Sequence, residues 1–199
     1  MTDDWGPYYD AARGGPPRTT LLLALDRFDS EHEPAEERFA VDLGCGEGRD
    51  TVELLRRGWR VLAIDAEAEA IARLRARPEV AGNDGIETAV SSFDEAAWPR
   101  TVLVNSSYAL PFCPPAGFEA VWARIVESLA PGGRFCGQLF GDRVEWATDP
   151  TLTTHRREDV ERLLEPFERE RFDEVEEDGE TALGKPKHWH LFHIVARKT

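Results

Sequence analysis

Cysteine is scarce and scattered in this sequence, which holds only Cys45, Cys113 and Cys136. No two of them have the Cys-x-x-Cys spacing that many structural zinc sites use, and an odd number does not close into a disulfide framework. These absences argue against a disulfide-stapled fold and against a structural zinc site. We therefore expect free thiols and no bound metal.

Positive charge and long apolar runs are also scarce. Lysine occurs only at Lys185, Lys187 and Lys198, and 38 acidic against 24 basic residues give a formal net charge of −14. This balance disfavours a nucleic acid or an anionic membrane as partner, because lysine and arginine drive binding to polyanions. The longest apolar run, Leu21 to Leu25, is too short to span a bilayer. The start, MTDDWGPYYD, lacks the features of a signal peptide, so we expect a cytoplasmic protein.

What the sequence does contain is enough apolar surface for a packed core. The chain has 199 residues, of which 41% are hydrophobic. This length and composition predict one folded domain over residues 1–199. Within it we expect an N-terminal aromatic and helical cap segment, residues 1–37, followed by a core, residues 38–199.

Strands and helices are predicted to alternate along the core. Gly58 and Pro78 are typical stops after the first two core helices. The segment before Thr19 is expected to be irregular, and residues 31–37 an exposed acidic loop. The expected strands cover residues 38–43, 59–65, 86–90, 101–105, 134–140, 170–177 and 188–198. The expected helices cover residues 21–28, 49–57, 67–77, 118–129 and 158–164.

This alternation predicts an α/β fold with helices on both faces of a mostly parallel sheet. The last two strands are joined by the turn DGETALGKPK and are expected to pair antiparallel. The many acids between Phe172 and Glu180 are typical of a charged edge strand that resists pairing with other chains.

The most informative stretch is VDLGCGEGRDT, Val41 to Thr51. A phosphate-binding loop would need Gly-Lys followed by Ser or Thr, and there is no Gly-Lys here. The dinucleotide pattern Gly-x-Gly-x-x-Gly would need a glycine at position 49, where the chain has Arg49. Glycines at Gly44 and Gly46, at the carboxyl end of a buried strand, allow the backbone to pass close to a ligand.

Two carboxylates accompany this turn. Asp42 ends the first strand, where burial is costly unless a polar partner is present. A ligand ammonium could be that partner, directly or through water or backbone amides. Asp65 ends the next strand, about twenty residues beyond the glycines, where a carboxylate can accept both hydroxyls of a ribose. Asp65 could equally cap the helix that follows, and the two roles are compatible.

VDLGCGEGRDT followed by VLAID resembles the first two motifs of class I S-adenosylmethionine-dependent methyltransferases. LAPGGRF, which leads into the fifth strand, matches the usual turn of that family, and the resemblance extends from about Arg38 to the C-terminus. Within the class, the small tellurite-resistance and thiol methyltransferase-like group is most similar, through WGPYYD, GEGRDT and HIVARK. The implied fold is Rossmann-like, with a seven-stranded, mostly parallel sheet and an antiparallel last strand.

The resemblance also implies a binding site for S-adenosylmethionine. The methionine moiety is expected beside the end of the first strand and its turn, and the carbonyl of Asn105 faces its amino group. Asp65 is the expected ribose acid, and Arg18 could pair with the carboxylate of the cofactor. Ser92 precedes Phe93 where the family often has an acid before an aromatic residue, so adenine has a weaker acceptor here. The expected cofactor-binding residues are Asp42, Gly44, Cys45, Gly46, Asp65, Ala66, Ser92, Phe93, Asn105 and Arg18.

The acceptor side is less defined by the sequence. Tyr108 and Phe112, in NSSYALPFCPP after the fourth strand, are expected to shape a small-molecule pocket, although core packing would also explain them. Nucleic-acid amino-methylating enzymes carry an Asn/Asp-Pro-Pro-aromatic motif here, which this chain lacks. Tyr9, in the aromatic N-terminal segment, and His188, in HWHLFHIV, are the other candidate substrate residues. No catalytic base can be assigned.

The sequence therefore predicts methyl transfer from S-adenosylmethionine to a small soluble acceptor, such as a thiol, a chalcogen oxyanion or another small metabolite. A non-catalytic S-adenosylmethionine-binding protein would carry the same cofactor motif. An NAD-dependent oxidoreductase is the remaining alternative, and the absence of a glycine at position 49 counts against it. We expect a monomer or a homodimer.

Overall fold

The structure is a computed structural model and describes residues 5–31 and 38–199. The acidic loop predicted over residues 31–37 therefore lies almost entirely outside the described residues. The strands are β1 (Phe39–Leu43), β2 (Arg60–Asp65), β3 (Ile86–Val90), β4 (Thr101–Ser106), β5 (Leu129–Gly141), β6 (Thr154–His155), β7 (Phe167–Glu180) and β8 (Pro186–Lys198). The helices are α1 (Gly6–Ala12), α2 (Thr19–Glu31), α3 (Arg49–Arg56), α4 (Ala68–Arg75), the 3₁₀ turn η2 (Leu110–Phe112), α5 (Pro115–Ser128) and α6 (Arg157–Leu163).

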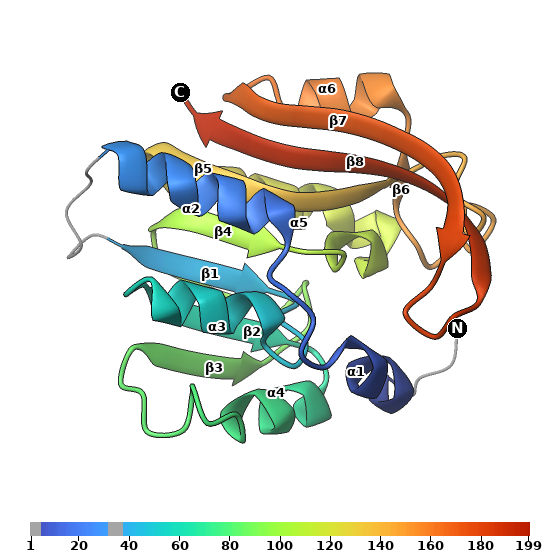
Figure 1. The fold of residues 1–199 in the computed structure, drawn as a ribbon. Coiled ribbons are helices and arrows are strands. Elements are labelled where there is room, and N and C mark those ends of the chain that lie inside the picture. Colours follow the sequence, from blue (N-terminus) through green and yellow to red (C-terminus); the bar gives the residue numbers. More distant parts are fainter. Residues whose placement is uncertain (1–4, 32–37) are drawn as a thin grey trace.

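In the described residues, the strands form one sheet in the order β3-β2-β1-β4-β5-β8-β7 (Figure 1). The strands β1 to β5 are parallel, whereas β8 runs antiparallel between β5 and β7. The predicted fold class and the antiparallel last strand are therefore confirmed. The sheet differs from the expectation by one short addition, because the two-residue β6 pairs with the end of β5.

Two apolar cores cover the two faces of this sheet. On one face, α2, α3 and α4 bury residues such as Leu25, Leu54 and Leu74. On the other face, α5 and α6 bury residues such as Val121 and Val160. The three-layer arrangement follows from βα alternation, since each amphipathic helix must cover sheet surface. No helix among the described residues is long and apolar enough to cross a membrane.

The N-terminal segment is more regular than the sequence predicts. Residues before Thr19 were expected to be irregular, but Gly6 to Ala12 form α1, with a proline in its first turn. Proline suits that position because its missing N–H has no partner there. The helix lies beyond the carboxyl ends of β1, β2 and β3 (Figure 1), so it faces the glycine turn rather than the core.

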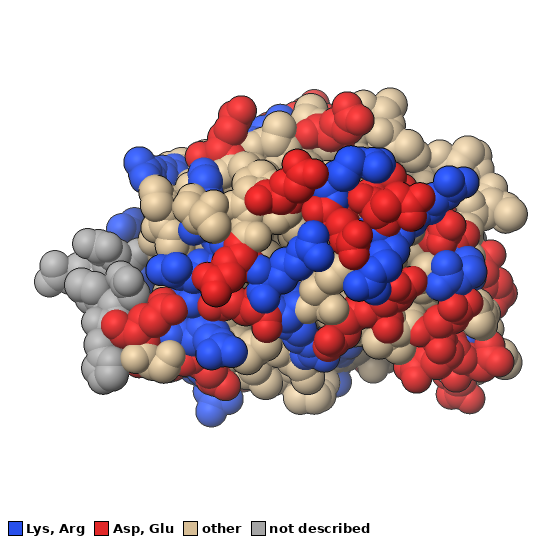
Figure 2. All heavy atoms as spheres, turned by 90° about the horizontal axis from the view of Figure 1, so that it is seen from above, with Lys and Arg blue, Asp and Glu red and all other residues tan. Residues whose placement is uncertain are grey.

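The charged edge strand predicted near the C-terminus is confirmed, since β7 forms one edge of the sheet. Several of its acids are paired with arginines on neighbouring elements. Arg143 lies 2.8 Å from Glu176, and Arg157 lies 2.8 Å from Glu174. Figure 2 accordingly shows acidic and basic side chains interleaved over the face above this edge.

A buried arginine joins α2 to this edge. The Arg134 side chain on β5 is fully buried and donates to Glu31 of α2 and to Glu170 of β7. Glu170 lies where the β7–β8 register shifts between Arg169 and Arg171, and that irregularity turns its carboxylate toward the guanidinium. Arg134 also lies 4.5 Å from the centre of the Phe28 ring.

We expect Arg134→Met to lower the free energy of unfolding by about 3 kcal/mol, because it leaves two carboxylates without their buried cation. Urea unfolding measures this loss. The control is Arg156→Met, since that side chain is 71% exposed and lies 3.9 Å from Asp142; its loss should stay below about 1 kcal/mol. Equal losses in the two variants would contradict the role given to Arg134.

Candidate cofactor-binding site

The glycine turn is a left-handed connection clamped to the neighbouring strand. Gly44 and Gly46 have φ values of +73° and +56°, a region that favours glycine. The amides of Gly44 and Cys45 both donate to the carbonyl of Ile64, at 2.8 and 3.0 Å. A Cβ on Gly44 would lie 2.2 Å from the Cβ of Ala109, so this position also lacks room for a side chain.

Asp65 holds the turn from the end of β2. Its Oδ2 accepts from the Gly46 amide at 2.7 Å, and its Oδ1 accepts from the Glu67 amide at 2.9 Å. Burial raises its pKa above the usual value. Each carboxylate oxygen accepts one of these bonds and has capacity for a second. The neighbouring Ala66 is exposed. Asp65 can therefore accept ligand hydroxyls without giving up its contacts with the turn.

Asp42 finds its polar partners within the protein. Its carboxylate accepts from the Thr51 hydroxyl at 2.5 Å and from Asn105 Nδ2 at 2.9 Å. The same Nδ2 lies 3.1 Å from the carboxylate of Asp50, so one amide joins two buried acids. Burial first, and then the charge of Asp50, raises the pKa of Asp42 to about 7. A ligand ammonium is thus not needed to satisfy Asp42, although it would find negative charge here.

Asp50 links this network to the chain before α2. It accepts from the backbone amide of Arg18 at 2.9 Å and from the Ser107 hydroxyl at 2.6 Å. These bonds bring Arg18 to the end of β4, where its guanidinium stacks 4.5 Å from the centre of the Tyr108 ring. Sequence reasoning assigned no role to Asp50. The available signal was the acid after the glycine turn in GEGRDT.

The helix α1 covers the turn. Tyr9 is 4% exposed, and its ring lies 3.7 Å from where a Cβ on Gly46 would stand. Burial, followed by the charges of Asp65 and Glu67, raises the pKa of Tyr9 far above its usual value. Tyr9, which was predicted as a substrate residue, lies beside Gly46 and close to Asp65.

Three contacts hold α1 in this position. Arg49, at the start of α3, donates to the carbonyl of Ala12 at 2.7 Å. Arg73 of α4 pairs with Asp10 at 2.6 Å. The ring of Trp5 meets Phe112 edge to face, with centroids 5.0 Å apart. The predicted N-terminal aromatic and helical cap segment is therefore attached to α3, to α4 and to Phe112.

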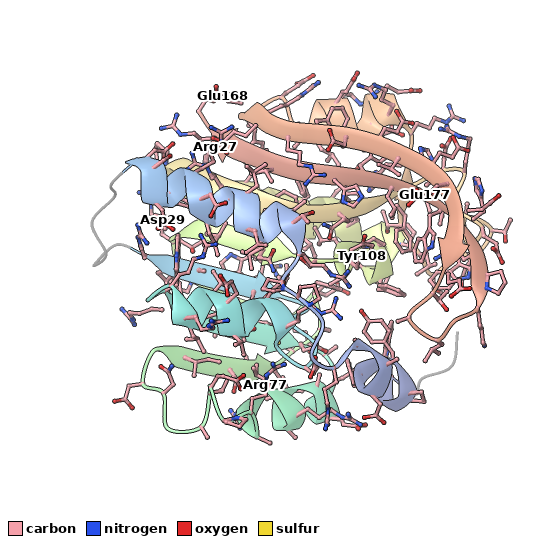
Figure 3. The ribbon with its side chains drawn as sticks, viewed as in Figure 1. Arg27, Asp29, Arg77, Tyr108, Glu168 and Glu177 are labelled. Atoms are coloured by element: carbon pink, nitrogen blue, oxygen red, sulfur yellow. The ribbon has the colours of Figure 1, made fainter. Side chains whose placement is uncertain are left out.

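The candidate acceptor residues Tyr108 and Phe112 belong to one aromatic cluster. Tyr108 lies beyond the carboxyl end of β4 (Figure 3), with a φ of +56° that is unusual for a side-chain-bearing residue. Its amide donates to Gln138 Oε1 at 3.1 Å, and this bond fixes the strained backbone. The cluster consists of Phe140, Val144, Leu152 and Leu191, with Tyr108, Phe112, Trp146, Ala147 and Trp189 packed against it.

The remaining predicted residues divide into two groups. Phe93 lies over the turn, 3.7 Å from where a Cβ on Gly44 would stand, and Ser92 donates to Glu95 at 3.3 Å. His188 is not brought to this group, because its imidazole pairs with Asp178 and Glu176 on β7. These acids raise the pKa of His188.

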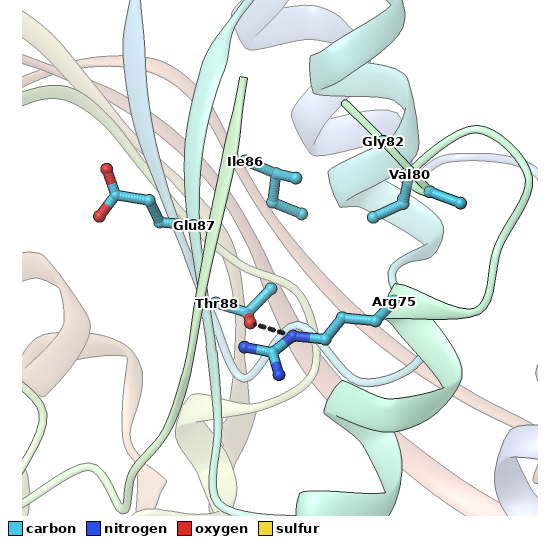
Figure 4. A pocket seen from close by; sticks show the side chains of 7 residues that line it. Arg75, Val80, Gly82, Ile86, Glu87 and Thr88 are labelled. Carbon is cyan, nitrogen blue, oxygen red and sulfur yellow. Dashed lines mark hydrogen bonds between the residues drawn. The ribbon is translucent and has the colours of Figure 1, made fainter. Parts of the chain in front are cut away.

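A separate hollow lies beside α4 and the edge strand β3 (Figure 4). It is lined by Arg75, Val80, Gly82, Ile86 and Thr88, among others, and Arg75 Nε donates to Thr88 there at 2.7 Å. The lining includes the start of β3, so the hollow lies away from the strand ends that carry the glycine turn. It is not part of the candidate site.

The fold has the Rossmann-like arrangement of class I methyltransferases, as the sequence predicts. Residues 40–133, which include the turn, Asp65 and Asn105, match the methyltransferase domain family.

Solved structures support the same fold. TehB from Haemophilus influenzae superimposes with a TM-score of 0.74 at 19% identity, covering 89% of this chain and 62% of that one. A 1,6-didemethyltoxoflavin-N1-methyltransferase from Burkholderia thailandensis, with bound 1,6-didemethyltoxoflavin and S-adenosylhomocysteine, gives a TM-score of 0.64 at 22% identity, covering 91% and 79%.

Among curated proteins, trans-aconitate 2-methyltransferase from Acidovorax sp. (strain JS42) is 30% identical over 124 residues, which is 57% of this chain. The protein of that name from Acidovorax ebreus (strain TPSY) is 29% identical over the same length. The chain spans 46% of the length of these relatives.

The raised pKa of Asp42 predicts a pH-dependent cost to folding. The folded state binds more protons than the unfolded state between about pH 4 and pH 7, so the stability contributed by protonated Asp42 is lost as pH rises across this window. We expect Asp42→Asn to gain stability relative to the wild type from pH 4 to pH 7, by more than about 1 kcal/mol. Urea unfolding at several pH values measures the difference, and a constant difference would show that Asp42 ionises normally.

Proposed function

We propose that this chain transfers a methyl group from S-adenosylmethionine to a small soluble acceptor. The observation that carries the proposal is the Asp65 carboxylate, which lies 2.7 Å from the Gly46 amide at the carboxyl end of β2. In open α/β sheets, an acid at this point binds ribose hydroxyls, and ligands occupy the crevice beyond the strand ends. The match of residues 40–133 to the methyltransferase domain family supports S-adenosylmethionine over NAD.

The residues present fit such a cofactor. Asp65 has acceptor capacity for two hydroxyls, and the exposed Ala66 and half-buried Phe93 offer a surface for adenine. Beneath the turn, the buried acids supply negative charge for an ammonium, while the Arg18 guanidinium supplies positive charge for a carboxylate. The residues proposed for the methionine moiety are Asp42, Gly44, Cys45, Gly46, Asn105 and Arg18, and Ser92 is proposed near adenine.

When bound, S-adenosylmethionine supplies an electrophilic methyl group on a sulfonium, and an acceptor takes that methyl in line as the sulfur leaves as a neutral thioether. The chain's own contribution is orientation and exclusion of water. Tyr9 and the rest of α1 would cover the turn, held by Arg49. A general base is required only when the nucleophile carries a proton, and we assign none.

Tyr108 and Phe112 are proposed to line the acceptor pocket. They belong to an aromatic cluster beyond β4 and β5, on the same edge of the sheet as the turn. The names of two relatives support a small acceptor, since one refers to trans-aconitate and the other structure contains 1,6-didemethyltoxoflavin. A thiol or a chalcogen oxyanion also remains within the proposal. His188 would contribute only through the ion pairs that orient the β7–β8 hairpin.

A nucleic-acid substrate is not proposed, because the net charge of −14 opposes polyanion binding. We further propose that residues 1–199 act as one domain, in the cytoplasm, as a monomer or a homodimer.

The proposal predicts methyl transfer that depends on Asp65. Purified protein with labelled S-adenosylmethionine should convert at least one member of a panel of thiols, carboxylates, chalcogen oxyanions and aromatic amines. Formation of S-adenosylhomocysteine measures turnover. Asp65→Asn should reduce the rate at limiting cofactor by about tenfold or more, because a charged acceptor for ribose hydroxyls is lost. The matched control Asp84→Asn changes an exposed acid away from the turn and should retain activity.

Cofactor binding with no turnover on any class would instead favour a non-catalytic S-adenosylmethionine-binding protein. Turnover that Asp65→Asn leaves unchanged would contradict the role given to Asp65.

A further inference from the structure

Lys187, the second residue of β8, is buried without a hydrogen-bond partner. Its exposed fraction is 3%, and Nζ finds no acceptor among the described residues. The other two lysines differ in this respect, because Lys185 is exposed and Lys198 donates to the carbonyls of Val126 and Leu129. A buried ammonium without an anionic partner is costly, so its presence in the fold requires an explanation.

Three aromatic rings form a cage around this amine. Nζ lies 2.8 Å from the centre of the Trp146 ring, 3.7 Å from that of Trp189 and 4.8 Å from that of Phe140. Ring faces attract a cation and partly offset its lost hydration. They accept no strong hydrogen bond, so the donor capacity of Nζ stays unused. The rings of Trp146 and Trp189 are only half-buried, and the cage therefore lies close to the surface.

The neighbouring carboxylate does not neutralise Lys187. Glu145 favours the ammonium through its charge, but its Oε2 accepts from the His188 amide at 3.0 Å and makes no ion pair with Nζ. Burial is the larger effect, and it lowers the pKa of Lys187 to about 7. An anion that reached Nζ would both complete its hydrogen bonding and restore its charge.

The cage adjoins the residues proposed for the acceptor pocket. The Phe140 ring meets Phe112 with centroids 6.0 Å apart, and the Trp189 ring meets Tyr108 at 6.5 Å. Because β8 runs antiparallel to β5, its first residues lie beside the carboxyl end of β5. The Trp189 ring therefore lies between Lys187 and Tyr108, and the Phe140 ring lies between Lys187 and Phe112.

We propose that Lys187 binds the anionic group of the methyl acceptor, a carboxylate or an inorganic oxyanion, within the cage formed by Trp146, Trp189 and Phe140. This inference rests on the proposed function, since it extends the acceptor site of that reaction. The rings of the cage supply apolar contact and Nζ supplies a positive charge, so the site favours a small anion with a compact charged group.

Calorimetry on the full chain tests this proposal in two steps. Protein is first titrated with S-adenosylhomocysteine, and the saturated complex is then titrated with trans-aconitate or, in a separate arm, with sodium tellurite. The two arms distinguish a carboxylate from an inorganic oxyanion. The trimethyl ester of trans-aconitate serves as the neutral probe. Lys187→Met is compared with Lys185→Met, which removes an exposed lysine two residues away.

We expect at least one anion to bind, and Lys187→Met to weaken that binding about tenfold or more, because a charge-assisted contact is lost. Lys185→Met should change it less than twofold, and the ester should bind wild type and Lys187→Met alike. Thermal melting confirms that each variant is folded. If Lys187→Met does not fold, Lys187→Gln is measured against the same expectations.

Equal anion binding in wild type and the folded Lys187 variant would overturn the proposal, as would the absence of binding by both anions. These outcomes are separate from the cofactor step. Failure of S-adenosylhomocysteine to bind would contradict the proposed function. If S-adenosylhomocysteine binds but the Lys187 variant binds the anion as the wild type does, only the role given to Lys187 is contradicted.

Discussion

The structure depends on one constraint, the left-handed turn from Gly44 to Gly48 and its clamp on β2. The Ile64 carbonyl takes two amides of the turn, and the Asp65 carboxylate takes a third. Neighbouring elements then pack into the space that the glycines leave. A Cβ on Gly48 would lie 2.2 Å from Leu74 Cδ1, so the Leu74 side chain of α4 occupies the space that the glycine leaves. The helix α1 covers the same turn through the buried ring of Tyr9, which lies against Gly46. The turn is thus contacted both by α1 of the N-terminal segment and by α4 of the core.

The buried carboxylates around the turn are costly for the stability of the fold. Asp42 and Asp50 are both buried and share one amide of Asn105. Their mutual repulsion adds to the effect of burial in raising the pKa of Asp42, and the hydroxyl and amide donors around the two acids offset part of it. Lys187 shows the opposite arrangement, a buried amine that forms no ion pair with any described residue. Buried charged groups that lower the stability of the fold are typical of binding sites, because a bound ligand can supply the opposite charge or the hydrogen bonds that the protein does not.

Much of this arrangement could be predicted from the sequence, because local rules specify it. The period of apolar residues predicted the strands and helices of the sheet. The glycine turn, together with the acid after the second strand, predicted the edge of the sheet at which the turn and Asp65 lie. Other features could not be predicted, since they depend on contacts between distant segments. The helix α1 lies in a Gly- and Pro-rich stretch, and aromatic contacts from Trp5 and a hydrogen bond from Arg49 hold it. Asp50 acquires its role only when Arg18 and Ser107 fold onto it. The pairing of His188 with β7 and the cage around Lys187 likewise arise from strand register, which composition does not reveal.

The most direct measurement of the central claim is calorimetric titration of S-adenosylhomocysteine, S-adenosylmethionine and NAD into the purified chain, repeated with Asp65→Ala. If the turn and Asp65 hold an adenosine ribose next to a methionine-type tail, both S-adenosyl compounds bind the wild type and bind Asp65→Ala far more weakly, while NAD does not bind. Binding of NAD alone, or no binding to a folded wild type, would contradict the account.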